Sequence, residues 1–335
     1  MNATRSFVTL GDLIADLVLG VEALPIELGQ HPAVSDLTLG PGGAGNALMA
    51  AARLGLRPVA LGGIGGDWIG ERVLSQLRVE GVDVTGVTVM PGETTPVSVV
   101  LRANGGQHVF MGRAGTRGPA RLGEADQRAL TSAGVVLVDG WTWRQDWPGV
   151  ILAGTQSAAQ AGVPVLFDPG PAGAWVDADW LLAMLAAASI LLATEAEADA
   201  LARRLGLSDS EALAERVATV VVKRGADGCR IRSGPQTWDC AGFPVSVVDP
   251  VGAGDCFAAA VAWGLLRGLA WDAIGAVANA VGAAMVQKAG TALAAPTRPE
   301  VAALLKQRRP DLAALLAPEG ADAIQRSRRA PRCEG

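Results

Sequence analysis

The sequence predicts an α/β fold organised around a buried, mostly parallel β-sheet. Short apolar or β-branched runs, too short to be helices, alternate with longer helical stretches along the 335 residues. The strand-like runs are apolar on both faces, which is typical of a sheet covered by helices on each side. No internal repeat and no Ser/Pro-rich linker divides the chain, so we expect one large domain.

In the N-terminal third, apolar periodicity and helix-ending residues define the elements. Asp67 is a candidate N-cap because a short acidic side chain can accept helix N–H groups, and Gly81 is a stop because glycine allows a left-handed end. The predicted elements are a strand at Phe7–Leu10, a helix at Gly45–Leu54, a strand at Pro58–Gly62 and a helix at Trp68–Glu80.

The remainder of the chain continues the same alternation. Its last two helices are rich in alanine and apolar almost all round, so we expect them to be deeply buried. The predicted strands are Val135–Val138, Val163–Phe167, Ile190–Ala193 and Val220–Val222, and the predicted helices are Trp147–Ala161, Ala178–Ala188, Glu195–Leu205, Cys256–Leu266 and Ala273–Val286.

Two segments depart from the alternation. Leu17–Leu39 and Thr95–Met111 show strand-like periodicity without intervening helices, as in Val97, Val99 and Leu101. We expect them to pair into a small antiparallel sheet outside the main one. Ligands of open α/β sheets bind beyond the carboxyl ends of the strands, so a small sheet there would serve as a lid.

Composition excludes several classes of partner. Mean hydropathy is +0.30, yet the longest apolar stretch, Trp180–Thr194, is shorter than the roughly 20 residues that span a membrane. Asp12 and Asp16 interrupt the first apolar segment, which argues against a signal peptide, so we expect a cytoplasmic protein with no membrane partner. A net charge of −5 argues against a nucleic-acid partner.

The cysteines and the C-terminal arginines indicate no additional site. Cysteines at 229, 240, 256 and 333 form no CxxC pair and do not complete a zinc site with the two histidines, so we expect reduced thiols. Arginines at 326, 328, 329 and 332 lie in a stretch without apolar periodicity, and residues 317–335 are expected to form a flexible tail.

Glycine is abundant and lysine is scarce, and both facts bear on phosphate binding. The chain has 43 glycines, but none of its three lysines (Lys223, Lys288 and Lys306) follows a glycine, so it lacks a P-loop. The GxGxxG, protein-kinase and GxSxG motifs are also absent, which argues against a dinucleotide-binding fold, a protein kinase and a serine hydrolase. A phosphate would then depend on backbone N–H groups at a helix start.

Two glycine-rich stretches offer such a start. In Asp249-Pro-Val-Gly-Ala-Gly-Asp255, the small residues 252–254 precede a helix, where N–H groups and the positive dipole end can receive an anion. Asp255 can accept a proton from an attacking hydroxyl there. Gly40-Pro-Gly-Gly-Ala-Gly-Asn46 also enters a helix, and Asn46 offers a donor and an acceptor. The alternative for each is a glycine-rich turn with a capping residue.

Together the two stretches resemble the paired signatures of the ribokinase-like (PfkB) carbohydrate kinase family. The resemblance covers Phe7–Pro299 and includes Gly11-Asp-Leu-Ile-Ala-Asp16, Gly63-Ile-Gly-Gly-Asp67 and Val221-Val-Lys-Arg-Gly225-Ala-Asp-Gly228. It implies a three-layer α/β/α sandwich with a mostly parallel sheet and a small β-sheet lid. The kinase domain would span residues 1–316, with lid segments at about 14–40 and 94–114. Family members commonly dimerise through the lid, so a homodimer is expected.

The resemblance also implies roles for individual residues. Asp255 is similar to the family's general base, and Gly252, Ala253 and Gly254 to its anion hole. The sugar contacts implied are Asp12, Asp16, Gly42, Gly43 and Asn46, and the ATP contacts are Lys223, Gly225, Gly228 and Asn279. Glu197 matches a carboxylate that organises Mg²⁺ indirectly, and Asp249, Val251 and Ala289 match a monovalent-cation loop that holds K⁺ in many members.

Some positions depart from the family pattern. Thr194 stands where Asn is usual near Mg²⁺, Leu48 where a small residue is usual, and Ile14 where ribokinase itself carries a polar sugar contact. Trp141 and Trp143 are candidates for a substrate pocket or for the core. Arg102 and Arg113, in the lid segments, are either contacts to an anionic sugar or solvated side chains.

The function expected is an ATP- and Mg²⁺-dependent sugar kinase that phosphorylates a primary hydroxyl. A nucleoside kinase of the same family is the alternative, in which Ile14 or Trp141 would form an apolar wall beside the base. A non-catalytic sugar-binding regulator is a further alternative, against which the intact 252–255 segment argues because a pure binder does not need the base.

Overall fold

A nine-stranded sheet forms the centre of the computed structural model, which describes residues 6–103, 105, 107–113, 118–140, 147–174 and 176–317. The strand order is β13-β12-β11-β10-β9-β8-β1-β4-β5, and the pairing is parallel from β5 to β11. Only β12 runs against its two neighbours within this sheet. The strands are β1 (Ser6–Asp12), β4 (Arg57–Gly65), β5 (Asp83–Met90), β8 (Val135–Asp139), β9 (Val165–Asp168), β10 (Ile190–Thr194), β11 (Thr219–Lys223), β12 (Cys229–Ser233) and β13 (Gln236–Cys240).

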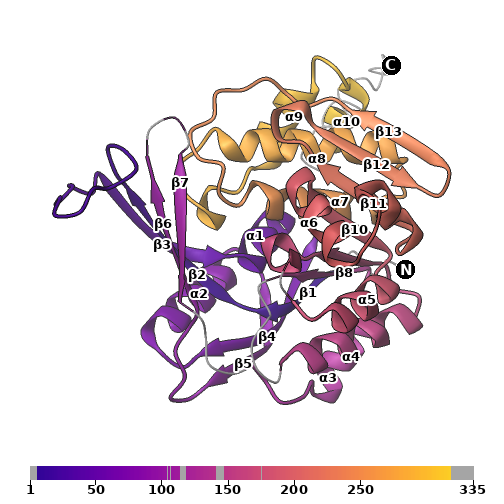
Figure 1. Cartoon of the computed structure of the whole chain (residues 1–335), viewed down its shortest axis with the longest axis horizontal. Helices are drawn as coiled ribbons and strands as arrows, with labels where there is room; N and C mark the ends of the chain where they lie inside the picture. The colour runs from indigo at the N-terminus through magenta and orange to yellow at the C-terminus, as the bar shows by residue number, and fades with distance from the viewer. Residues whose placement is uncertain are drawn as a thin grey trace, which may run out of the picture.

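Helices cover both faces of the sheet and complete three layers (Figure 1). Alternate strand residues enter opposite cores, so Phe7 packs in one cluster and its neighbour Val8 in the other. One face carries α1 (Ala44–Arg53), α2 (Trp68–Val79), α7 (Ala253–Leu265), α8 (Trp271–Val286), α9 (Arg298–Leu305) and α10 (Pro310–Leu315). The other carries α3 (Glu124–Thr131), α4 (Trp147–Gln160), α5 (Ala178–Ala187) and α6 (Glu195–Arg204). The predicted α/β/α sandwich is confirmed.

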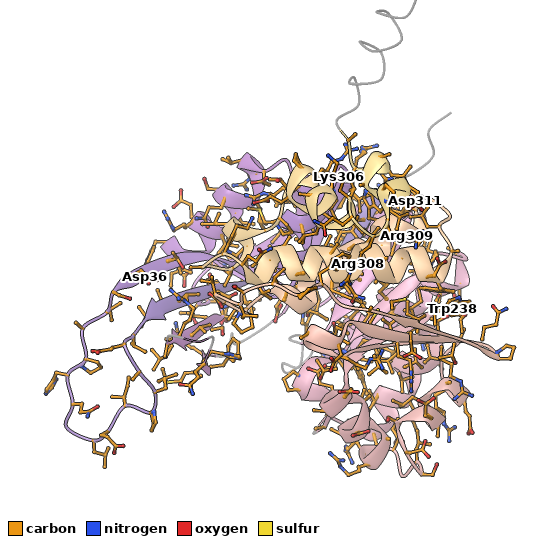
Figure 2. All side chains as sticks on the ribbon, turned by 90° about the horizontal axis from the view of Figure 1, so that it is seen from above. Asp36, Trp238, Lys306, Arg308, Arg309 and Asp311 are labelled. Atoms are coloured by element: carbon orange, nitrogen blue, oxygen red, sulfur yellow. The ribbon has the colours of Figure 1, made fainter. Side chains whose placement is uncertain are left out.

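A second, four-stranded sheet projects from this body as the predicted lid (Figure 2). Its order is β3-β2-β6-β7, formed by β2 (Ile14–Gly20), β3 (Asp36–Gly42), β6 (Val97–Arg102) and β7 (His108–Arg113). The expectation of an antiparallel lid is wrong at its centre, because β2 and β6 pair in parallel. These strands come from separate segments with β4, α2 and β5 between them, so no hairpin forces them to run in opposite directions.

Most predicted elements differ from the observed ones only at their ends. Asp67 caps α2 by accepting the Gly70 N–H at 2.9 Å, and Gly81 has a φ of +86° just beyond the helix end. Sequence periodicity missed β5, β12 and β13, whose burial is uneven or which lie at the sheet edge. Among the described residues, no helix is long and apolar enough to cross a membrane.

Candidate active site

The carboxyl ends of the parallel strands place polar side chains at one edge of the sheet. Asp139 ends β8, Asp168 ends β9, Thr194 ends β10 and Lys223 ends β11. All four line a cavity of about 320 Å³ that the lid covers with residues of β2, β6 and β7. This is where ligands of open α/β sheets bind.

The start of α7 forms another wall of this cavity. The helix begins at Ala253, three residues before the predicted start at Cys256, so Asp255 lies in its first turn. Gly252 is the N-cap residue, with a φ of +77°, a left-handed conformation that favours glycine. The first-turn N–H groups of a helix have no intrahelical acceptor, so the 252–255 segment presents donors and the positive dipole end to the cavity. The Ala253 N–H is partly used, since it donates to the Pro250 carbonyl at 3.3 Å.

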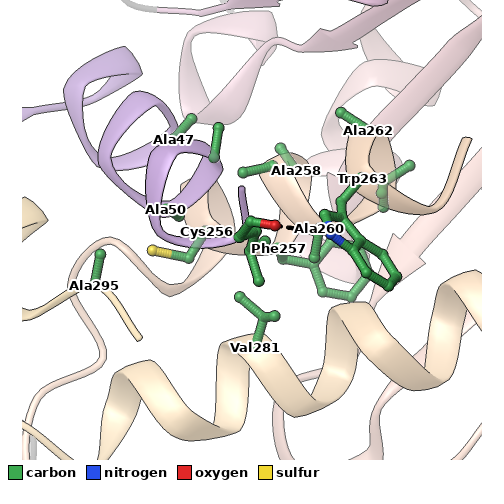
Figure 3. Packing of buried hydrophobic residues seen from close by; sticks show 14 of the residues in the cluster. Ala47, Ala50, Cys256, Phe257, Ala258, Ala260, Ala262, Trp263, Val281 and Ala295 are labelled. Atoms are coloured by element: carbon green, nitrogen blue, oxygen red, sulfur yellow. Dashed lines mark hydrogen bonds between the residues drawn. The ribbon is translucent and has the colours of Figure 1, made fainter. Parts of the chain in front are cut away.

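Asn46 of α1 meets Asp255 across the two helix starts. Its Nδ2 donates to Asp255 Oδ2 at 2.8 Å, which joins residues 209 positions apart. The helices approach closely because small side chains such as Ala47 and Ala258 lie between them, as Figure 3 shows. Further along, Trp263 Nε1 donates to the Leu54 carbonyl at 3.0 Å and fixes the same pair of helices.

Asp255 has a strongly shifted pKa. Burial raises the pKa to about 8, the Asn46 hydrogen bond opposes the shift, and the nearby negative charges of Asp139 and Asp168 add to it. Such a group releases its proton near neutral pH, which suits a general base.

Asp16 lies on β2 and faces the cavity from the lid side. It is 4% exposed, and its pKa is raised well above the usual value by burial and then by the charge of Asp255. A Cβ atom at Gly42 would overlap the Asp16 carboxylate, so this position requires glycine. Gly43, the N-cap of α1 with a φ of +50°, also lines the cavity.

Lys223 forms a largely buried ion pair beside the 252–255 segment. Its Nζ lies 2.6 Å from Asp168 Oδ2, and the two side chains are 13% and 12% exposed. Burial alone would lower the pKa of Lys223, but Asp168 and Glu197 outweigh it and raise that pKa. The Nζ also lies close to Gly254, 3.4 Å from the place of a Cβ atom there.

A second cavity, of about 460 Å³, shares Lys223 and Gly254 with the first as lining residues. Gly225, Gly228 and Asn279 line it, together with an apolar wall that includes Phe243 and Val286. Gly228 has a φ of +93° and leaves no room for a Cβ atom against the Cys240 carbonyl, which itself accepts the Asn279 Nδ2–H at 2.8 Å. Two cavities therefore meet at Lys223 and Gly254, beside the start of α7.

A profile of the pfkB family carbohydrate kinases matches residues 4–298. The chain belongs to this family. It is 32% identical over 293 residues to the ATP-dependent ribose-1-phosphate kinase of Halopiger xanaduensis, covering 87% of this chain and 95% of that protein. The fold matches the Burkholderia thailandensis nucleoside kinase with inosine (TM-score 0.75, 23% identity, covering 91% and 99% of the chains). It also matches the Arabidopsis thaliana ribokinase with ribose and ATP (TM-score 0.74, 24% identity, 90% and 99%).

Carboxylates near the cavity of this pfkB-family kinase suit a hard cation such as Mg²⁺. Glu197 and Asp168 line the cavity, as does the start of α7. Thr194 and Glu197 form a capping box: Glu197 Oε2 accepts the Thr194 N–H at 2.7 Å and Thr194 Oγ1 accepts the Glu197 N–H at 3.3 Å. Within the described residues no three acidic, histidine or cysteine side chains gather into an all-protein metal cage. Mg²⁺ commonly keeps waters and substrate phosphates as ligands, so the two carboxylates of Glu197 and Asp168 are a donor set that suits it.

In the loop where a monovalent cation was expected, groups of the protein itself already contact the Asp249 carboxylate. Asp249 is fully buried, and its carboxylate accepts the Val251 N–H at 3.0 Å and the Gly290 N–H at 3.2 Å. Arg102 Nε lies 3.4 Å from Asp249 Oδ2. A second positive charge at this carboxylate would be repelled, so the residues present do not fit K⁺ at Asp249. Ala289, in the same loop as Gly290, is exposed.

The remaining predicted positions fall in different places. Asp12 is buried at the end of β1 and is not part of the cavity wall among the described residues. Arg113 lines the cavity, whereas Arg102 instead pairs with Asp36 and Asp249. Trp141 and Trp143 lie outside the described residues, as does the tail from residue 318 onward.

Sequence reasoning missed Asp139 and Asp168. Both directly follow runs that were predicted as buried strands, Val135–Val138 and Val163–Phe167. A carboxylate just after a buried parallel strand is a usable signal, because such strands end at the ligand-binding edge.

Proposed function

We propose that the chain is an ATP- and Mg²⁺-dependent sugar kinase that transfers the γ-phosphate to a primary hydroxyl of a small carbohydrate. The observation that carries this proposal is the position of Asp255 and the 252–254 segment, where two cavities meet. The cavity under the lid would hold the acceptor. The second cavity, which is lined by Gly225, Gly228 and Asn279, would hold the nucleotide. Such an enzyme is expected in the cytoplasm, where ATP is available.

In the proposed reaction, Asp255 takes the proton of the acceptor hydroxyl. At the same time the hydroxyl oxygen of the acceptor forms a bond to the γ-phosphorus of ATP. The bond from that phosphorus to the β,γ-bridging oxygen breaks, and ADP leaves. The N–H groups at the start of α7 hold the transferred phosphoryl group, and Lys223 adds a positive charge beside it. Asp16, Asn46 and Gly43 orient the sugar, with Asn46 also keeping the Asp255 carboxylate in place.

Mg²⁺ would be held by phosphate oxygens and, through water, by Glu197 and Asp168. It would neutralise charge on the phosphates. Glu197 has one oxygen committed to its own helix start, so an indirect contact suits it. Thr194 in place of the usual Asn completes this capping box, and the carboxylate position is kept without the amide.

A ribose-based acceptor is the first to test, since ribose-1-phosphate kinase is the name of a relative at 32% identity. The cavity has basic side chains on the lid side, His108 and Arg113, that could face a phosphate. ADP release should be measured with ribose, ribose 1-phosphate and inosine as acceptors, and the phosphorylated carbon identified by ³¹P NMR. Turnover of none of these or of other sugars, despite binding, would favour the non-catalytic regulator.

A nucleoside kinase is the second candidate, and the apolar lid residues favour it. Ile14, Val97 and Phe110 line the acceptor cavity and could stack on or pack against a base. Phe110→Ala should then raise KM for inosine by about tenfold or more while changing KM for ribose little. Met111→Ala is the matched control, because Met111 is the exposed neighbour on β7 and is not part of the cavity wall among described residues.

A homodimer through the lid is the partner proposed. The lid exposes apolar side chains on its two edge strands, Leu37 on β3 and Val109, Phe110 and Met111 on β7. Exposed strand edges with such side chains favour pairing with another chain. Light scattering at two protein concentrations should give twice the monomer mass, and a monomer mass at both would reject the dimer.

A further inference from the structure

Arg102 is a largely buried arginine that reaches across the lid sheet. The register places Asp36 on β3, Gly20 on β2 and Arg102 on β6 in one row. Arg102 Nη2 donates to both Asp36 carboxylate oxygens, at 3.0 and 2.9 Å. Gly20 makes this possible, since a Cβ atom there would overlap the Asp36 carboxylate. Figure 2 shows Asp36 on the lid, away from the sheet body.

The same side chain also reaches the body of the protein. Val100 lies two residues before Arg102 on the same face of β6 and packs with Val18 and Val251. This apolar contact holds β6 close to the loop that contains Asp249. The Arg102 Nε atom lies 3.4 Å from Asp249 Oδ2. The Arg102 side chain is only 12% exposed, so the pairing is largely shielded from water.

Asp249 connects this arginine to the anion-binding segment. Its carboxylate holds the Val251 N–H on one side and the Gly290 N–H on the other. Val251 is followed immediately by Gly252, the N-cap of α7. A charge that neutralises Asp249 therefore supports the backbone that begins the phosphate-binding turn.

We propose that Arg102 acts as a built-in cation at Asp249, in place of a bound monovalent ion, and positions the 252–254 segment from the lid. This rests on the proposed function, in which that segment receives the transferred phosphoryl group. The activity is then independent of K⁺, and loss of the positive charge at position 102 creates a dependence on an added cation. Because Arg102 belongs to β6, whose residues Val97 and Ser98 line the acceptor cavity, the lid and the phosphate site are held by one side chain.

The test compares the wild type with Arg102→Met, which removes the charge and keeps an apolar stem. Arg102→Lys keeps a charge, and Asp36→Asn removes only the outer partner. Turnover and both KM values are measured in chlorides of potassium, sodium and tetramethylammonium at equal ionic strength. Melting temperature without substrates is measured in the same salts, which gives a readout independent of activity.

The turnover of the wild type, Arg102→Lys and Asp36→Asn should differ by less than about twofold among the three salts, because the ionic strength, and so the screening of charges, is the same in each. Arg102→Met should turn over about tenfold more slowly in tetramethylammonium, and K⁺ or millimolar guanidinium should restore much of that loss. Its melting temperature should rise with K⁺ specifically, whereas that of the wild type should not.

Potassium activation or K⁺-specific stabilisation of the wild type would overturn the proposal. An Arg102→Met enzyme equally slow in all salts and unaffected by guanidinium would also overturn it. If Arg102→Met does not fold, the wild-type and Arg102→Lys salt series decide the question. If no acceptor is phosphorylated by the wild type, the proposed function fails, and the melting temperatures still test the cation role.

Discussion

Asparagine in place of Asp255 tests two consequences of one largely buried carboxylate. Burial raises the pKa of Asp255 from the usual 3.8 to about 8, against the opposing hydrogen bond from Asn46. The folded protein therefore holds this proton more tightly than the unfolded chain. The resulting stabilisation is fully present below pH ~4 and is lost as the pH rises through about 8.

The size of the effect follows from the two pKa values. Between pH 5 and pH 7 the wild type should lose about 3 kcal/mol of stability through this group. The asparagine in Asp255→Asn does not titrate, so the variant should not show this loss. The free energy of unfolding of the variant relative to the wild type should therefore increase by about 3 kcal/mol from pH 5 to pH 7. The variant should also lose about three orders of magnitude in turnover, as removal of a general base does.

Urea unfolding at pH 5, 6 and 7 measures the first effect and ADP release the second. Asp199→Asn is the control, because Asp199 is exposed on α6 and should show neither effect. A difference in unfolding free energy that stays constant with pH would refute the shifted pKa. Near wild-type turnover by Asp255→Asn would refute the role of general base.

Three further variants test other parts of the site. Asn46→Ala removes the hydrogen bond that lowers the pKa of Asp255, so kcat/KM at pH 7 should fall about tenfold and its pH profile should move to higher pH. Lys223→Met leaves a buried carboxylate unpaired, so urea unfolding should show a loss of about 3 kcal/mol, with a higher KM for ATP. Gly42→Ala displaces the Asp16 carboxylate, so KM for the acceptor should rise while KM for ATP stays unchanged.

Each of these variants has a clear contrary result. An unshifted pH profile for Asn46→Ala would mean that its amide does not influence the base. Wild-type stability of Lys223→Met would mean that the ion pair contributes little. For Gly42→Ala, Gly149→Ala on α4 is the control, since nothing lies within 4 Å of a Cβ atom there; equal KM values in both would remove the steric argument.

The elements of the fold were predictable because their signals are local. The helix at Trp68 could be delimited from Asp67 and Gly81, and the structure shows the expected cap and left-handed glycine. Inner strands of the central sheet such as β8 and β10 are buried on both faces because helices cover both faces. β5 and β13 escaped prediction because they are the edge strands of this sheet, and strands there are less constrained in pattern. β12 lies next to the edge, and its burial is uneven.

The sequence by itself determined most of the strands and helices and the two glycine-rich turns that enter helices, because periodicity, caps and glycine conformations act over a few residues. It also excluded a P-loop. Only the tertiary structure decided that Asn46 meets Asp255 and that Arg102 faces Asp249 rather than a ligand. It also decided the parallel pairing of β2 with β6. These outcomes depend on strand register and helix packing between distant segments, where one residue of shift turns a side chain to the opposite face.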